Sequence, residues 1–287
     1  LNVSPGGENS NLSDTHGADS LDYESYYVIK SDYGWSSLYN LIDTLNNYSD
    51  SIEKLLNVDR TLWFHALNYT LINFDSYIGY AQNYYLYKDA TKQFNPILWD
   101  LNMSFGSFRL TDASSLYFSG FDIAQAQNMD PLLHHDQISV SPRPLLRNLF
   151  LSERNRKMYI AHIRTIVQEY FLSQYYYTRG QYLQNLIDIS VQNDTNKFYS
   201  YSDFITNLTN SVPLVAGDCP GITQLMDARA SYLSNYTGFT GEPTISNILY
   251  SPQNFNLGDD IFISASIDNA THAILAYRFG HNIPFKQ

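Results

Sequence analysis

Two aspartates, Asp75 and Asp100, stand where the chain turns between regular elements, and a pair of strand candidates lies between them. Residues 83–88 alternate in the pattern of a strand, and residues 94–99 return after a polar turn. Two carboxylates beside a hairpin are a common arrangement for metal or phosphate chemistry. Asp75 follows the end of a predicted helix, where the helix dipole disfavours a negative charge, so its position indicates a role other than capping.

Kinases use two carboxylates in different roles for phosphoryl transfer. The first follows a helix and orients the accepting hydroxyl group, and the second follows a short hairpin and holds Mg²⁺ against the phosphates. Asp75, the hairpin and Asp100 occur in this order. The order alone is a weak signal, because aspartates are common beside turns.

Several familiar catalytic motifs are missing from the sequence. It has no Gly-rich phosphate loop of the Walker or dinucleotide type, no Gly-x-Ser-x-Gly elbow and no His-Glu-x-x-His helix. Cys219 is the only cysteine, so neither an intrachain disulfide nor a cysteine metal cage is expected. His65 is predicted to pack or to lie at the surface, and His134 and His135 are predicted to lie at the surface or form hydrogen bonds, rather than to bind a metal.

The composition narrows the class of protein. A net charge of −11 over 287 residues argues against a nucleic-acid groove or an anionic membrane surface as a partner. Hydrophobic residues make up 44% of the chain, which is enough for a sizeable core. The 25 tyrosines suit an extracellular protein that covers its surface with few charges. No apolar run of about 18 residues occurs, so no membrane span is predicted.

The predicted elements around the two aspartates are mostly helices. Residues 1–22 contain hardly any apolar residue and predict a flexible lead-in, and residues 26–30 predict a short strand. Residues 107–142 predict a long loop with short helical turns. Apolar residues at helical spacing predict further helices, beginning near residues 36, 52, 59, 152, 182, 204 and 220.

The composition changes after Gly238. Residues 245–250, 260–267 and 272–278 read as three strands at the spacing of a sandwich. Three strands do not form a stable two-sheet sandwich, so we expect residues 239–287 to be part of an immunoglobulin-like β module. Further C-terminal β domains are expected in the full-length protein.

Three motifs in the centre of the chain resemble the signature of the CotH kinase family, which is named for a spore coat protein. They are Leu-Ile-Asn-Phe-Asp-Ser-Tyr at 71–77, Asn-Tyr-Tyr-Leu-Tyr at 83–87 and Pro-Ile-Leu-Trp-Asp-Leu-Asn-Met-Ser-Phe-Gly at 96–106. The resemblance covers roughly residues 23–236. It implies an α+β fold in which residues 23–238 form a mostly helical, protein kinase-like C-lobe built around one β-hairpin.

The resemblance also implies an activity and a set of site residues. Family members are atypical kinases that use ATP and a divalent ion such as Mg²⁺ to phosphorylate Ser or Thr of secreted, surface or coat proteins. If the roles of the family's residues are transferred to the matching positions of this sequence, Asp75 is the catalytic carboxylate and Asp100 is the magnesium ligand. Asn83 and Asn102 are then the cofactor-binding amides. Asn102 departs from the pattern, because many members have a second Asp there. The residue five positions after Asp75, where ordinary kinases have a metal-binding Asn, is Tyr80.

Kinases also have a sheet-rich lobe that covers the nucleotide and contributes a Lys to its phosphates. The short lead-in is not expected to build such a lobe, and Lys30 is the only lysine before Lys54. Two alternatives follow: either the sequence begins after that lobe, or the protein is a reduced relative without full ATP binding.

Two other functions fit the same residues. The protein could be a noncatalytic extracellular binding or scaffold module, in which the acidic pair holds a structural cation or only caps turns. It could also be a glycan-active enzyme with Asp75 and Asp100 as acid and base, which requires carboxyl groups about 5 Å or about 6.5–9.5 Å apart.

Overall fold

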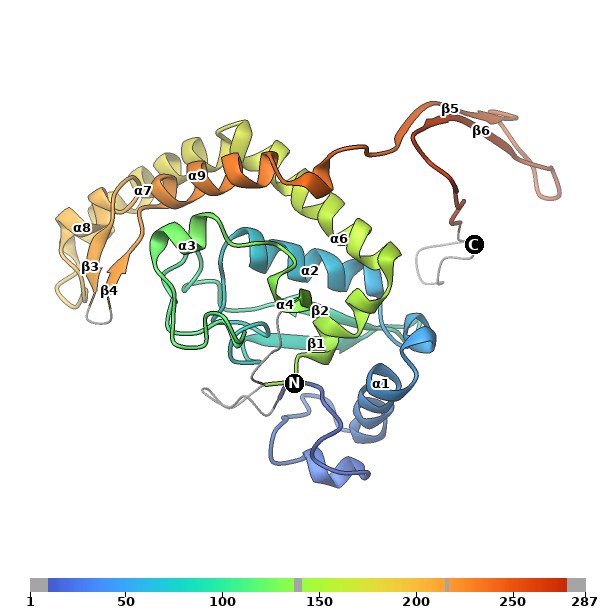
Figure 1. Cartoon of the computed structure of the whole chain (residues 1–287), viewed down its shortest axis with the longest axis horizontal. Coiled ribbons are helices and arrows are strands. Elements are labelled where there is room, and N and C mark those ends of the chain that lie inside the picture. The colour runs from blue at the N-terminus through green and yellow to red at the C-terminus, as the bar shows by residue number, and fades with distance from the viewer. Residues whose placement is uncertain (1–9, 137–140, 215–216, 278–287) are drawn as a thin grey trace. The chain divides into compact units, whose positions relative to one another are not determined.

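A computed structural model describes residues 10–136, 141–214 and 217–277, and the chain forms two compact units, Leu1–Asn235 and Tyr236–Gln287 (Figure 1). The predicted mixed helical and β fold is confirmed, with helices predominating. Strands in the described residues form three separate two-stranded antiparallel sheets. No helix in the described part of the chain is both long and apolar enough to pass through a membrane.

Helix α2 (Val58–Thr70) lies at the centre of the first unit and leads directly to Asp75. It begins at Asn57, whose side-chain oxygen accepts a hydrogen bond from the Arg60 backbone N–H at 3.1 Å. Helix α6 (Glu153–Ile166) begins after the capping residue Ser152 and runs beside α2 (Figure 1). Both helices were predicted, because their apolar residues recur at helical spacing.

The predicted hairpin is present and follows α2. Strands β1 (Tyr84–Lys88) and β2 (Phe94–Leu98) pair antiparallel, with Leu86 opposite Pro96. Phe94, the first residue of β2, is fixed to the segment before α2, because its N–H donates to the Leu55 carbonyl at 2.7 Å. The hairpin therefore has a defined position against α2, and its far end delivers the chain to Asp100.

Residues 10–13 are buried, although a flexible lead-in was expected there. Tyrosine hydroxyls provide the reason, because they hydrogen-bond to this backbone. The Tyr77 hydroxyl donates to the Asn11 carbonyl at 2.7 Å, and the Leu12 N–H donates to the Tyr27 hydroxyl at 2.9 Å. The strand predicted at 26–30 is not formed; Val28 alone makes a β-bridge.

The other elements of the first unit are short, apart from three helices. Helix α1 (Trp35–Asn47) buries its predicted apolar stripe, and α7 (Tyr175–Asn193) buries none of its residues. The long loop contains short helical turns, as predicted. The remaining elements are η1 (Ser20–Tyr23), η2 (Ser49–Lys54), α3 (Ile123–Gln127), α4 (Leu133–Asp136), α5 (Pro144–Arg147), η3 (Leu149–Leu151), the π-helical η4 (Val167–Leu172), α8 (Tyr201–Thr206), β3 (Val212–Leu214), β4 (Gly217–Cys219) and α9 (Ile222–Ser234).

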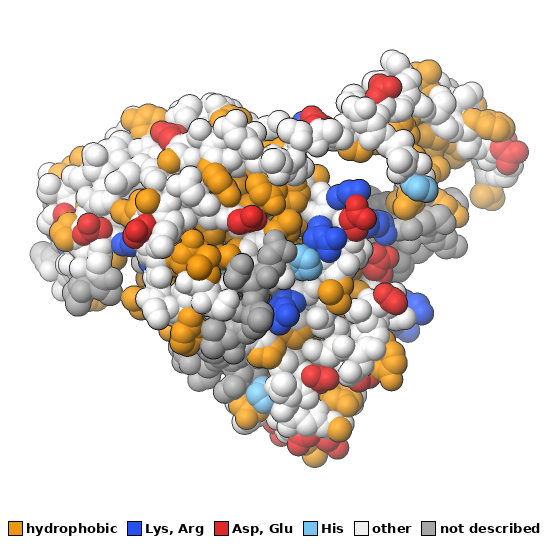
Figure 2. All heavy atoms as spheres, in the orientation of Figure 1, with side chains coloured by type: hydrophobic (Ala, Val, Ile, Leu, Met, Phe, Trp, Pro, Cys, Tyr) orange, Lys and Arg blue, Asp and Glu red, His pale blue; other side chains and the backbone are white. Residues whose placement is uncertain are grey.

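The second unit contains one hairpin after the short helix η5 (Thr237–Phe239). Strands β5 (Thr244–Ser251) and β6 (Phe262–Asp268) pair antiparallel, and hydrophobic side chains lie at the surface of this hairpin (Figure 2). The third predicted strand is not formed over residues 272–277, and residue 278 lies outside the described residues. An immunoglobulin-like fold is therefore not confirmed for this unit.

Candidate active site

Asp75 lies in the loop between α2 and β1, and its carboxylate is half-buried. The Gln82 side-chain amide donates a hydrogen bond to Oδ1 of Asp75. Nδ2 of Asn83 donates to Oδ2 at 3.1 Å and also to the Asp75 backbone carbonyl at 2.9 Å. Both carboxylate oxygens are therefore oriented by amides from the same loop.

The loop is shaped by contacts at its beginning. The Asn73 N–H donates to the Asn68 carbonyl at 2.8 Å, and the Ser76 hydroxyl donates to the Asn73 carbonyl at 2.6 Å. Gly79 closes the loop against the residue before Asp75. A Cβ atom at this glycine would lie 1.9 Å from the Phe74 carbonyl oxygen, so only glycine permits the approach.

Two buried arginines hold the backbone on either side of this loop. Arg143 donates from Nε to the Ile78 carbonyl at 2.9 Å and from Nη2 to the Gly79 carbonyl. Arg229, on α9, donates to the Tyr69 and Thr70 carbonyls at the end of α2, at 2.9 and 3.1 Å. The last carbonyls of a helix have no partner within the helix, so Arg229 satisfies the end from which the Asp75 loop departs.

Asp100 is brought to the same loop by the chain that follows the hairpin. The Phe105 N–H donates to the Leu71 carbonyl at 2.8 Å, and the Gly106 N–H donates to the Ile72 carbonyl at 3.2 Å. Residues 100–106 therefore run beside the segment that carries Asp75. Asp100 itself is exposed. Asn102 is also exposed, and it forms no hydrogen bond with any other described residue.

The two aspartates are close enough to interact electrostatically. Partial burial raises the pKa of Asp75, and the negative charge of Asp100 raises it further. The hydrogen bonds from Gln82 and Asn83 act in the opposite direction but do not cancel the effect. A carboxyl group with a raised pKa is a stronger proton acceptor when ionised, as a general base requires.

The backbone around the pair adopts an uncommon conformation at several positions. Within residues 72–105, five described residues other than glycine have φ between 49° and 59°: Ile72, Ala81, Asn83, Asp100 and Phe105. Such a φ is a genuine outlier for a β-branched residue such as Ile72. Strained residues persist only where the surroundings fix them, and they concentrate at functional sites.

The two carboxylates fit a metal ion that takes its other ligands from a bound phosphate group. The described residues contain no group of three or more His, Cys, Asp or Glu placed to hold a metal. Mg²⁺ does not require one, because it commonly binds one or two carboxylates and takes its other ligands from substrate phosphates and water. Asp75 and Asp100 provide that number of carboxylates, and a cation between them would relieve their mutual repulsion.

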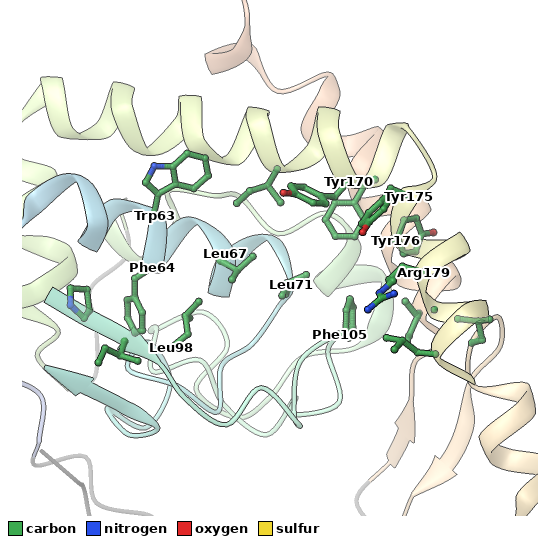
Figure 3. A pocket seen from close by; sticks show the side chains of 18 of the residues that line it. Trp63, Phe64, Leu67, Leu71, Leu98, Phe105, Tyr170, Tyr175, Tyr176 and Arg179 are labelled. Carbon is green, nitrogen blue, oxygen red and sulfur yellow. The ribbon is translucent and has the colours of Figure 1, made fainter. Parts of the chain in front are cut away.

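A large apolar pocket of about 810 Å³ opens beside the Asp100 segment (Figure 3). Side chains along one face of α2, including Trp63 and Leu67, form one wall, and aromatic residues of η4 and α7 form another. Leu98 and Phe105, on either side of Asp100, also line it. No local sequence pattern predicts this pocket, because its walls come from segments far apart in the chain.

Two of the three histidines singled out in the sequence lie in the core, and His135 is partly exposed. His65 is fully buried, and its Nε2 lies 3.0 Å from the Leu145 carbonyl oxygen. His134 is buried beside Tyr69 and Asp112 and forms hydrogen bonds with both. These two histidines therefore have the packing and hydrogen-bonding roles that were predicted.

A model of the family described as CotH kinase protein matches residues 4–236. The chain belongs to the CotH kinase family. The match begins upstream of the predicted start near residue 23, and it includes the buried segment 10–13. A search of curated proteins found no match to the chain. Membership of this family implies a kinase-like protein and nucleotide use in general, and its link to the spore coat suggests a surface or coat location.

Proposed function

We propose that this CotH family member transfers a phosphoryl group from ATP to Ser or Thr hydroxyls of secreted, surface or coat proteins. One observation carries the proposal: the half-buried carboxylate of Asp75 is oriented by Gln82 and Asn83 and has Asp100 as its charged neighbour. Kinase-type transfer depends mainly on positioning and on charge stabilisation. Asp75, whose carboxylate is fixed, would position the acceptor hydroxyl. Asp100, which is exposed, would hold the metal ion that stabilises charge.

In this proposal each residue of the site has its own role. Asp75 orients the acceptor hydroxyl and takes its proton, a role favoured by its raised pKa. Asn83 keeps Asp75 in place through two hydrogen bonds. Asp100 holds Mg²⁺, and Asn102 offers an amide oxygen two residues away. The bound Mg²⁺ and ATP supply the transferable phosphoryl group and the positive charge that stabilises it.

A noncatalytic binding or scaffold module is the second candidate. It is favoured by the hydrogen bonding of Asp75, because both of its carboxylate oxygens already have partners within the loop. In this alternative, Asp75 and Asp100 stabilise turns and bind no nucleotide.

A measurement of nucleotide binding distinguishes the kinase from the noncatalytic scaffold module. We expect Mg²⁺ and ATP together to raise the melting temperature of the full-length protein, because a ligand at about 100 times its Kd stabilises the folded state by about 2.7 kcal/mol. Asp100→Asn should abolish the rise, and Asp50→Asn, at an exposed aspartate on η2, should keep it. An unchanged melting temperature in the wild-type protein, or an equal rise in Asp100→Asn, would favour the scaffold.

A further inference from the structure

A second cavity, of about 790 Å³, lies at the tip of the β1–β2 hairpin. It is bounded by residues 29–34, by the beginning of α1 and by the hairpin turn. Three lysines line it: Lys30 before α1, Lys88 at the end of β1 and Lys92 in the turn. Asp89 is the only acidic residue among the described residues of the lining, so lysines outnumber acids here in a chain whose net charge is −11.

Asp89 keeps its negative charge but forms no ion pair with these lysines, because its carboxylate is held inside the turn. Its Oδ1 accepts hydrogen bonds from the Thr91 N–H at 2.8 Å and the Thr91 hydroxyl at 2.6 Å. Its Oδ2 accepts one from Nδ2 of Asn95 at 2.9 Å. The carboxylate therefore holds the turn together as an Asx motif.

The three lysines together outnumber Asp89, and they are not tied up in ion pairs within the described residues. None of the three lysines forms an ion pair with a described acidic side chain. Lys88 is the most constrained, since its Nζ donates to the Ser37 hydroxyl at 3.0 Å and lies 5.6 Å from the centre of the Phe94 ring. Lys30 and Lys92 are exposed and leave their ammonium groups available to a ligand.

The beginning of α1 adds hydrogen-bond donors to the same cavity. Gly34 precedes the helix and has no side chain to cap it, and the first turn contains no acidic residue. The first backbone N–H groups of a helix have no acceptor within it, and of residues 35–37 Ser37 lines the cavity. Free N–H groups at a helix start favour an anion, and here they supplement the lysines.

We propose that this lysine-lined cavity binds a phosphoryl group carried by a phosphorylated peptide or by a nucleotide. A phosphoryl group has two negative charges and several acceptor oxygens, which matches ammonium groups, hydroxyls and free N–H groups converging on one cavity. Tyr33 and Tyr87 line the cavity and are 83% and 60% exposed, so they offer apolar contacts to the rest of the ligand.

The cavity is separate from the Asp75 and Asp100 pair. Strand β1 runs from beside Asn83 to Lys88, and five residues of strand span about 17 Å. The proposal therefore does not depend on phosphoryl transfer at the aspartates, and either one could fail while the other holds.

Calorimetric titration of the full chain with a phosphoserine peptide, the same peptide with serine, and ADP tests the proposal. A chelator is present throughout, so that metal-dependent binding at Asp100 does not contribute. The test variant is Lys30→Gln with Lys92→Gln, and the matched control is Lys54→Gln with Lys157→Gln. The control removes the same charge from exposed lysines outside the cavity. Circular dichroism checks that both variants are folded.

We expect the phosphoserine peptide or ADP to bind the wild-type and control proteins, and the tighter of the two ligands identifies the source of the phosphoryl group. Binding should weaken at least about tenfold in the test variant, because two charged partners are lost. Added salt should weaken it as well. Equal binding of the serine and phosphoserine peptides without ADP binding, or equal affinity in the test and control variants, would overturn the proposal.

Discussion

The protein contains two hairpins with similar local patterns and different surroundings. β1–β2 buries Tyr84, Leu86 and Phe94, whereas no residue of β5 or β6 is buried. An isolated two-stranded hairpin is at best marginally stable in water. The difference indicates that a hairpin can hold neighbouring side chains in place only after other elements fix it, and β1–β2 is fixed by α2 and by the backbone before it.

The largest expected effect comes from breaking the buried network around the first hairpin. Arg229→Met removes a buried donor from four backbone carbonyls, those of Tyr69, Thr70, Ala126 and Met129, and of these Tyr69 keeps the Ile72 N–H. We expect the first unit to lose about 3–5 kcal/mol of unfolding free energy in urea titrations. The matched variant Arg179→Met, at an exposed arginine, should cost less than about 1 kcal/mol. Equal losses would show that Arg229 does not hold the end of α2.

Acid should destabilise the first unit through a buried histidine. Burial lowers the pKa of His65 from 6.5 to about 4. Between these pH values the unfolded chain binds a proton that the folded chain does not, so stability falls as pH falls, by up to about 3 kcal/mol. His65→Gln should flatten this part of the curve of unfolding free energy against pH. An unchanged slope in the variant would contradict the assignment.

A matched pair of truncations compares the two hairpins directly. Leu86 on β1 is 8% exposed and Ile263 on β6 is 51% exposed. Leu86→Ala should cost about 2–3 kcal/mol of unfolding free energy, and Ile263→Ala less than about 1 kcal/mol, because little of its side chain is buried. Chemical denaturation of both variants measures the difference. Similar costs would show that the second hairpin is packed in solution.

The smallest expected effect on stability is at Asp75. Its raised pKa means that ionisation costs folding free energy, so wild-type stability should decline as pH rises from the ordinary value of 3.8 through the raised pKa. Asp75→Asn removes this penalty and also weakens the hydrogen bonds from Gln82 and Asn83. The two changes oppose each other, so we expect a net change below about 1 kcal/mol at neutral pH and a flatter pH profile. A large loss of stability at neutral pH would mean that Asp75 is a structural residue.

The parts of the fold that were predicted correctly are encoded locally. Helix α2, the hairpin and the order of Asp75 and Asp100 follow from residue periodicity and turn residues within about 45 positions. The sequence predicted the order of the two aspartates but not the contacts that bring them together. Those contacts are hydrogen bonds from residues 105 and 106 to residues 71 and 72, just after α2, and they have no local pattern.

The features that were not predicted depend on partners far away in the chain. Arg229 bonds carbonyls 159 and 160 residues earlier, and Tyr84 bonds the Ser10 carbonyl 74 residues earlier. A signal for Arg229 existed, because it stands inside the apolar stripe of α9 where a charge is costly to bury. Residues 10–13 carried no such signal, because their polar composition also fits a solvated loop. Of the strand predicted at 272–278, residues 272–276 are irregular and Tyr277 makes a single β-bridge, so alternation alone was not enough to specify a strand.

The central claim is that β1–β2 holds Asp75 and Asp100 as a phosphoryl-transfer pair. Transfer of radiolabelled γ-phosphate from ATP to a mixed Ser/Thr peptide library tests it most directly, with full-length wild-type protein, Asp75→Asn, Asp100→Asn and the control Asp50→Asn. We expect Mg²⁺-dependent transfer by the wild-type and control proteins, and a loss of at least about 100-fold in each of the other two variants while they remain folded. Transfer at the wild-type rate by either variant, or no transfer by a wild-type protein that binds Mg²⁺ and ATP, would contradict the claim.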